Sequence, residues 1–223
     1  MPDTPTMALT IKLVRHGEST ANVGLVKSWE VGDHTVELTP EGQRQSRTAG
    51  ESIGRNFLAG AIAYSSPFRR ARQTLDGLLG GAGLERSTTE VYEDPQLREV
   101  DHGYVSIDSQ RPLQTTHGPF YYRFQGGESP ADCYDRTSGF LESMMRQVIR
   151  REAQRVLIVT HGLTIRCFVM RFMHLTVEQF ESIANPNNCA VITLAPRDSM
   201  PEPSFVNSRW GVWGLRVGRQ ASL

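Results

Sequence analysis

Residues 9–22, LTIKLVRHGESTAN, decide the fold of this chain. The stretch opens with a short, mostly apolar run that contains β-branched residues, and Gly17 closes it, a pattern typical of a strand buried in a sheet. Arg15 and His16 come directly at the end of that run. In open α/β sheets, ligands bind outside the carboxyl ends of the strands. A cation and an imidazole beside free backbone N–H groups there suit an anionic ligand.

A second stretch repeats this arrangement. Residues 156–162, VLIVTHG, form another apolar run that ends in His161 and Gly162, and a helical pattern follows them. If the two strands are neighbours, their ends place two imidazoles in one crevice. The alternative interpretation is that each glycine only supplies an unusual backbone angle where a strand ends.

Length and composition limit the class of protein. With 223 residues, the chain suits one α/β domain that covers residues 1–223 and buries most of its apolar surface. Lysine plus arginine and aspartate plus glutamate both number 24, so no overall field attracts nucleic acid or a membrane surface. An anion site must therefore be local.

The cysteines, the first eight residues and the lengths of the apolar stretches indicate where the protein is located in the cell. Three cysteines without close spacing favour a reducing compartment. The first eight residues lack the features of a signal peptide and are expected to be disordered, and no apolar stretch approaches the roughly 20 residues of a membrane span. These features predict a cytoplasmic protein with no nucleic-acid or membrane partner.

In the remainder of the chain, predicted strands alternate with predicted helices, as is typical of α/β folds. The expected strands are 9–14, 61–64, 88–92, 156–160 and 189–195. The expected helices are an irregular one at 19–29, then 40–57, one from Pro67 to the glycines at 80–83, 130–152, 163–173 and a short one from Thr176. The tail that contains Trp210 and Trp213 is expected to belong either to an interface or to the core.

Two further segments carry candidate functional groups. Arg69, Arg70 and Arg72 lie near a predicted helix start, where positive charge opposes the helix dipole, so they form either a solvated basic face or an anion site. Residues 105–128 show no clean periodicity and are rich in aromatics, which indicates either a lid-like excursion or packing on the body.

Four motifs in this order resemble those of the histidine phosphatase superfamily, the phosphoglycerate-mutase-like enzymes. They are RHGE at 15–18, SSPFRRARQT at 65–74, LREVDHG at 97–103 and THG at 160–162. The run FYYRFQGGES at 120–129 most resembles a phosphatase-like branch of plants and fungi. The resemblance implies a three-layer α/β/α sandwich with a mostly parallel central sheet.

The resemblance also implies the roles of individual residues. His16 matches the nucleophile that forms a phosphohistidine, and Glu99 matches the proton donor, with Asp101 as the nearest rival. The residues that match the phosphoryl-binding positions are Arg15, Asn22, Arg70 and His161. Arg70 is chosen within its cluster because the family's pocket arginine directly precedes an alanine. His102 is interpreted as ring packing or pocket lining.

The expected activity is hydrolysis of a small phosphorylated substrate without a metal or other cofactor. Because dimers occur in the family, the resemblance leaves both a monomer and a homodimer open. Guanidinium groups fit phosphate oxygens, and a neutral imidazole splits the displacement into two steps. A phosphoglycerate-type mutase is the first alternative, although the excursion contains few cations. An inactive phosphate-binding module is another, and a metal-dependent hydrolase is disfavoured because no histidines pair at HxH or HExxH spacing.

Overall fold

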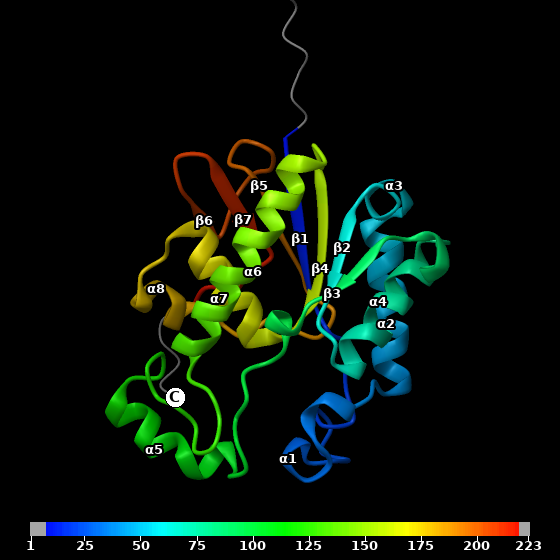
Figure 1. The fold of residues 1–223 in the computed structure, drawn as a ribbon. Coiled ribbons are helices and arrows are strands. Elements are labelled where there is room, and N and C mark those ends of the chain that lie inside the picture. The colour runs from blue at the N-terminus through cyan, green and yellow to red at the C-terminus, as the bar shows by residue number, and fades with distance from the viewer. Residues whose placement is uncertain (1–7, 219–223) are drawn as a thin grey trace, which may run out of the picture.

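The computed structural model describes residues 8–218, which form seven strands in one sheet flanked by helices (Figure 1). The order of the strands across the sheet is β3-β2-β4-β1-β5-β7-β6. Their bounds are β1 Thr10–Arg15, β2 Ile62–Ser65, β3 Val91–Glu93, β4 Arg155–Thr160, β5 Val191–Pro196, β6 Phe205–Val206 and β7 Trp210–Trp213. Of the segment expected to be disordered, residues 1–7 lie outside the described residues.

The sheet is mixed and mostly parallel, as expected. Strands β3, β2, β4 and β1 pair in parallel, and β5 is antiparallel to β1, β7 to β5 and β6 to β7. Five of the seven strands therefore run in the same direction. The tryptophan-containing tail supplies the last two strands, so Trp213 is buried in the fold and does not form a free surface.

Helices cover both faces of the sheet, which confirms the three-layer architecture (Figure 1). Their bounds are α1 Ser28–Val31, α2 Pro40–Ile53, α3 Arg55–Leu58, α4 Arg69–Gly81, α5 Ile107–His117, α6 Pro130–Arg150, α7 Gly162–Met173 and α8 Val177–Ser182. Helices α6 and α7 lie on one face, and α2 and α4 lie on the other.

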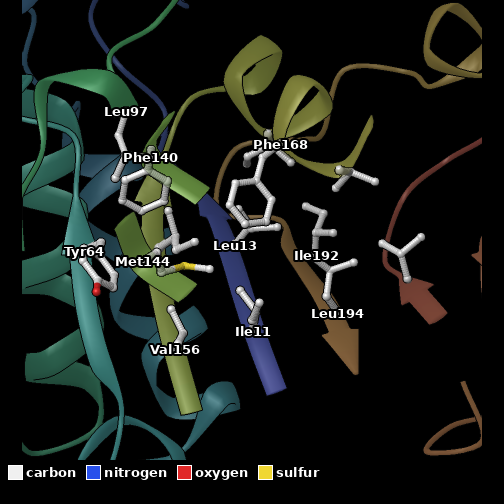
Figure 2. Close-up of a cluster of buried hydrophobic side chains, with 14 of the residues drawn as sticks. Ile11, Leu13, Tyr64, Leu97, Phe140, Met144, Val156, Phe168, Ile192 and Leu194 are labelled. Carbon is white, nitrogen blue, oxygen red and sulfur yellow. The ribbon is translucent and has the colours of Figure 1, made fainter. Parts of the chain in front are cut away.

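The two-residue period of the strands explains why both faces are covered. Ile11 and Leu13 of β1 join Phe140 and Phe168 in the core beneath α6 and α7 (Figure 2). Val14 points to the other face and joins the cluster beneath α4. Because both faces of β1 are apolar, the strand is buried in the centre of the sheet.

Several predicted boundaries are wrong in detail. Helix α2 ends at Ile53 because Gly54 adopts a φ of 84°, and the expected last turn becomes the separate α3. Helix α4 begins at Arg69, two residues after the proline that was expected to start it. Only α1 is helical within the segment 19–29, and β3 begins three residues later than predicted.

The excursion at 105–128 contains a helix that its sequence pattern did not predict. Helix α5 is interrupted by Pro112 and buries only Gln110, so it lacks the apolar face that makes a helix recognisable. After α5, Phe120, Tyr122 and Phe124 are buried in a third cluster. The aromatics therefore pack on the body of the molecule, as one of the two interpretations proposed.

No helix within residues 8–218 is both long enough and apolar enough to cross a bilayer.

Candidate active site

The parallel pairing of β1 with β4 brings the two predicted histidines together. Arg15 lies opposite Thr160 in the register, and the His16 N–H donates to the Thr160 carbonyl at 2.9 Å. The ring centroids of His16 and His161 are 5.1 Å apart, with the planes inclined at 60°. Both rings are buried, so two strand ends form one imidazole pair as the sequence predicted.

The glycines after these histidines are required by close approach. A Cβ atom on Gly17 would lie 2.5 Å from the Gly42 carbonyl oxygen, and one on Gly162 would lie 2.2 Å from Oδ1 of Asn185. Neither glycine has a positive φ. The interpretation that they supply an unusual backbone angle is therefore wrong, and any larger side chain would push neighbouring segments away from the site.

The hydrogen bonds of His16 define which ring nitrogen can react. Its Nδ1 lies 2.8 Å from the Gly17 carbonyl oxygen, which can only accept a hydrogen bond. Nδ1 therefore carries the proton, and in the neutral ring the lone pair lies on Nε2. Burial lowers the pKa of His16 well below its ordinary value of 6.5, and the positive charges of Arg70 and Arg15 lower it further. The ring is thus neutral at pH 7.

His161 is oriented by a residue that was not among the predicted site residues. Its Nε2 lies 2.8 Å from Oγ of Ser66, which also accepts a hydrogen bond from the Phe68 N–H. Burial, together with Arg70, lowers the pKa of His161 well below 6.5, so its ring is neutral as well. The other ring nitrogen, Nδ1, is buried and has no hydrogen-bond partner among the described residues.

Ser66→Ala tests this arrangement, because it removes the hydroxyl that is hydrogen-bonded to the His161 ring. We expect kcat to fall by about 3- to 10-fold, the range of one hydrogen bond, with a smaller change in KM. The matched control is Ser65→Ala, since Ser65 is equally buried but its hydroxyl donates to the Ser66 carbonyl. Equal losses in the two variants would show that Ser66 only contributes to packing.

Two arginines lie beside the histidines. Arg70, at the start of α4, is only 4% exposed, and Arg15 at the end of β1 is largely buried. Each lowers the pKa of both histidines through its positive charge, which places all four groups in one electrostatic cluster. The Arg15 Nη1 donates to the Pro186 carbonyl at 2.6 Å, and its buried Nε has no partner among residues 8–218.

The other two arginines of the predicted cluster point elsewhere. Arg69 is paired with Glu37 and Arg72 with Glu93, and both guanidinium groups are more than half exposed. The choice of Arg70 within the cluster therefore agrees with its burial.

Arg70 also has a partner that the sequence did not reveal. Its Nη1 donates to the Asp33 carbonyl at 2.6 Å, and its Nη2 donates to the Asp33 carboxylate at 3.0 Å. Asp33 lies in a short 3-10 helix, Asp33–Thr35, between α1 and α2. Nothing in the local sequence distinguishes this carboxylate from its neighbours, because the contact depends on how the segment folds back over α4.

Of the two candidate acids, Glu99 lies nearer the cluster. Its charge raises the pKa of Arg15, and its Oε1 accepts hydrogen bonds from the N–H and hydroxyl of Thr164 at 3.3 and 3.2 Å. Oε2 receives no hydrogen bond from a described residue. Asp101 is exposed, and its carboxylate accepts the Gly103 N–H at 2.8 Å. The geometry favours Glu99 over Asp101.

Asn22 lies next to the cluster, with its amide oxygen already occupied. That oxygen accepts from the Ser19 N–H at 3.0 Å and from Nδ2 of Asn188 at 3.1 Å. Asn188 also donates to the His16 carbonyl at 3.1 Å, and it was not predicted as a site residue. The two asparagines tie the loop after β1 to the loop before β5.

A cavity of 320 Å³ adjoins the cluster. Glu99 lines it directly, Asp33 connects it to Arg70, and Phe68 packs its ring edge against His161 with the centroids 5.2 Å apart. His102 lies on its wall and also packs on Phe124, 4.6 Å between centroids, so both interpretations of that residue are confirmed. Within residues 8–218, no three His, Cys, Asp or Glu side chains are grouped as a metal ion would require.

The site therefore combines two neutral imidazoles, the buried guanidinium of Arg70, the half-buried guanidinium of Arg15 and one carboxylate near the ends of parallel strands. A family model described as the histidine phosphatase superfamily, branch 1, matches residues 11–209. This chain belongs to the histidine phosphatase superfamily.

Curated relatives include plant, fungal and bacterial proteins. The phosphoglycerate mutase-like protein AT74H of Arabidopsis thaliana is 37% identical over 203 residues, which cover 80% of this chain and 71% of that protein. The broad-range acid phosphatase DET1 of Saccharomyces cerevisiae is 26% identical, covering 85% of this chain and 86% of its own. Mutases occur too. The 2,3-bisphosphoglycerate-dependent phosphoglycerate mutase of Brucella melitensis is 30% identical, and the match covers 78% of this chain and 85% of that protein. Histidine phosphatase relatives thus include both phosphatases and mutases.

The fold matches solved structures of the same superfamily architecture. The mycobacterial glucosyl-3-phosphoglycerate phosphatase superposes with a TM-score of 0.69 at 22% identity, covering 96% of this chain and all of that one. At this level of identity the match concerns the fold alone.

Proposed function

We propose that this histidine phosphatase superfamily member is a phosphatase that hydrolyses a phosphomonoester through a phosphohistidine on His16. The observation that carries the proposal is the state of His16: a neutral ring with its proton held on Nδ1 and a free lone pair on Nε2. Arg15, Arg70 and His161 surround it with donors that suit the three oxygens of a phosphoryl group.

The proposed reaction has two steps. In the first, Nε2 of His16 attacks phosphorus, the bond to the ester oxygen breaks, and Glu99 gives a proton to the departing alkoxide. In the second, a water attacks the phosphohistidine, Glu99 takes the proton of that water, and phosphate leaves with His16 neutral again. Charge stabilisation by the two guanidiniums and the ring of His161 accounts for most of the rate, since phosphoryl transfer depends mainly on positioning and electrostatics.

Arg70 can take part while it is bound to Asp33. A guanidinium has five N–H donors, and the contacts with Asp33 use only donors on Nη1 and Nη2. The remaining donors suit a phosphoryl oxygen. The buried Nε of Arg15 and Nδ1 of His161, which lack partners among the described residues, suit the others.

Hydrolysis is favoured over mutase chemistry by the surroundings of the cluster. A mutase must retain a bisphosphorylated intermediate, which calls for further fixed cations. The excursion's Arg111 and Arg123 are paired with Asp108 and Asp132, are about 60% exposed, and do not line the cavity. No lysine lines it either.

Acid-quench labelling with a ³²P-phosphomonoester, run beside phosphate release and the conversion of 3- to 2-phosphoglycerate, tests the proposed function. We expect an acid-labile, base-stable adduct on His16 and stoichiometric release of phosphate. Conversion of the phosphoglycerate without net release would identify a mutase, and the absence of both adduct and turnover would identify a phosphate-binding module.

Glu99→Gln tests the proton donor. The amide retains the hydrogen bonds to Thr164 but cannot give a proton to the leaving group. We expect kcat/KM to fall by about 10²- to 10⁴-fold for alkyl phosphates and by much less for p-nitrophenyl phosphate, whose leaving group needs no proton. Asp101→Asn is the control and should affect both leaving-group classes alike. A uniform loss in Glu99→Gln would argue against its role as an acid.

The depressed pKa values of His16 and His161 predict the response to acid. The unfolded chain takes up protons on both imidazoles below their ordinary pKa of 6.5, and the folded protein does so only at lower pH. The free energy of unfolding should therefore decrease as pH falls below 6.5, and the acid limb of kcat/KM should lie below 6.5. Urea denaturation at pH 7.5, 6.5 and 5.5 measures the first effect, and a stability that rises toward pH 5.5 would contradict it.

A further inference from the structure

Large apolar side chains are exposed around the mouth of the cavity. Of the thirteen exposed large hydrophobic residues in the described part of the chain, nine lie in two segments, 23–31 and 104–121. They are Val23, Leu25, Trp29, Val31, Tyr104, Val105, Ile107, Leu113 and Tyr121. We call these nine residues the apolar rim.

The two segments lie at the same end of the molecule. Helices α1 and α5, which belong to them, both extend beyond the carboxyl ends of β1 and β4, where the histidine pair lies (Figure 1). Trp29 from one segment and Tyr104 and Ile107 from the other line the cavity that contains Glu99. Three residues of the apolar rim therefore share a cavity with Glu99, the proposed proton donor to the leaving group.

The charges on that wall are mostly negative. Glu99 and Asp101 line the cavity, and neither forms an ion pair with a lysine or arginine among residues 8–218. Arg98 is the one guanidinium of the lining, and it donates to Glu128. A substrate carrying a second anionic group would place it against the Asp101 carboxylate, which repels it.

The geometry points to a substrate class: phosphomonoesters whose leaving group is apolar and bears no second negative charge. The cluster of guanidiniums and imidazoles binds the phosphoryl group, and Trp29, Tyr104 and Ile107 remove the apolar part of the leaving group from water. This inference rests on the proposed phosphatase function, since the rim selects among substrates for the same reaction.

The test compares three alkyl phosphates by phosphate release. Ethyl phosphate and n-hexyl phosphate differ in apolar length, and 6-(phosphonooxy)hexanoate has the hexyl chain with a carboxylate at its far end. We expect kcat/KM for hexyl phosphate to exceed that for ethyl phosphate by about tenfold or more, because each buried methylene favours binding. The carboxylated ester should be at least about tenfold poorer than hexyl phosphate.

Variants assign the preference to the rim. Trp29→Ala and Tyr104→Ala should each lower the ratio of kcat/KM between hexyl and ethyl phosphate several-fold. Ile149→Ala is the matched control, because Ile149 on α6 is 72% exposed but lies outside the cavity. It should leave the ratio unchanged. Asp101→Asn, which preserves the acceptor for the Gly103 N–H, should raise kcat/KM for the carboxylated ester alone.

The two proposals fail in different ways. If none of these esters nor p-nitrophenyl phosphate releases phosphate, the proposed phosphatase function is wrong. If the esters are hydrolysed but chain length has no effect, or the carboxylated ester is as good a substrate as hexyl phosphate, the inference about the leaving group is overturned while the phosphatase function stands. Equal ratios in Trp29→Ala, Tyr104→Ala and Ile149→Ala would overturn the assignment of the preference to the rim.

Discussion

His16→Ala should abolish turnover, lowering kcat by about 10⁴-fold or more, the scale seen when a covalent nucleophile is removed. The reason is specific to its position: no other imidazole nitrogen in the cluster combines burial, neutrality and a proton held on the opposite ring atom by a carbonyl. His161 is a poor substitute, because its Nε2 is occupied by the Ser66 hydroxyl.

The measurement is phosphate release together with acid-quench labelling. The variant should form no acid-labile adduct, while its far-ultraviolet circular dichroism and binding of inorganic phosphate persist, because Arg15 and Arg70 are unchanged. His102→Ala is the control, since His102 lies on the cavity wall with its ring against Phe124 and outside the cluster. Labelling that survives in His16→Ala, or disappears only in His102→Ala, would mean that the nucleophile has been assigned wrongly.

Arg70→Ala should cause the second large loss of activity. Removing this buried guanidinium eliminates donors that are aimed at the charge that develops on the phosphoryl oxygens, so we expect kcat/KM to fall by about 10²- to 10³-fold. It also removes the charge that helps to keep both histidines neutral, so the acid limb of the pH profile should move to higher pH.

Arg69→Ala provides a matched comparison one residue away. Arg69 is 59% exposed and its partner is Glu37 on the surface, so its loss should change kcat/KM by less than about threefold. Kinetics over pH 4.5–8 on both variants give the two readouts together. Similar losses in Arg69→Ala and Arg70→Ala would reverse the choice of pocket arginine, and an unmoved acid limb in Arg70→Ala would contradict the electrostatic argument.

The chain's local patterns were sufficient to identify the elements that position the site. A short, mostly apolar run whose residues enter the core on both faces of the sheet is recognisable as a central strand, and two such runs end in His16 and His161. The family resemblance also selected Arg70 through its place before Ala71, and Arg70 is the buried arginine of its cluster. Boundaries were less predictable: α4 starts at Arg69, with Phe68 at its N-cap position and no side chain capping it.

The residues that the sequence did not single out share a physical cause. Asp33 contacts Arg70, Asn188 contacts His16, and Ser66 contacts His161, and in each case the partners are far apart in the chain. Such contacts depend on how loops fold over strand ends. Helix α5 escaped prediction because it buries only Gln110 and shows no apolar face, so its apolar residues Ile107 and Leu113 remain exposed.

The sequence by itself thus determined the sheet, the two histidine-bearing strand ends and the superfamily, because these follow from short-range periodicity and from motifs that are contiguous in the chain. Only the tertiary structure decided which ring nitrogen of His16 is free, which carboxylate lies near Arg15, and that Trp29 lines the same cavity as Tyr104 and Ile107. Those features are set by distances between residues that the chain brings together only when the helices have packed on both faces of the sheet.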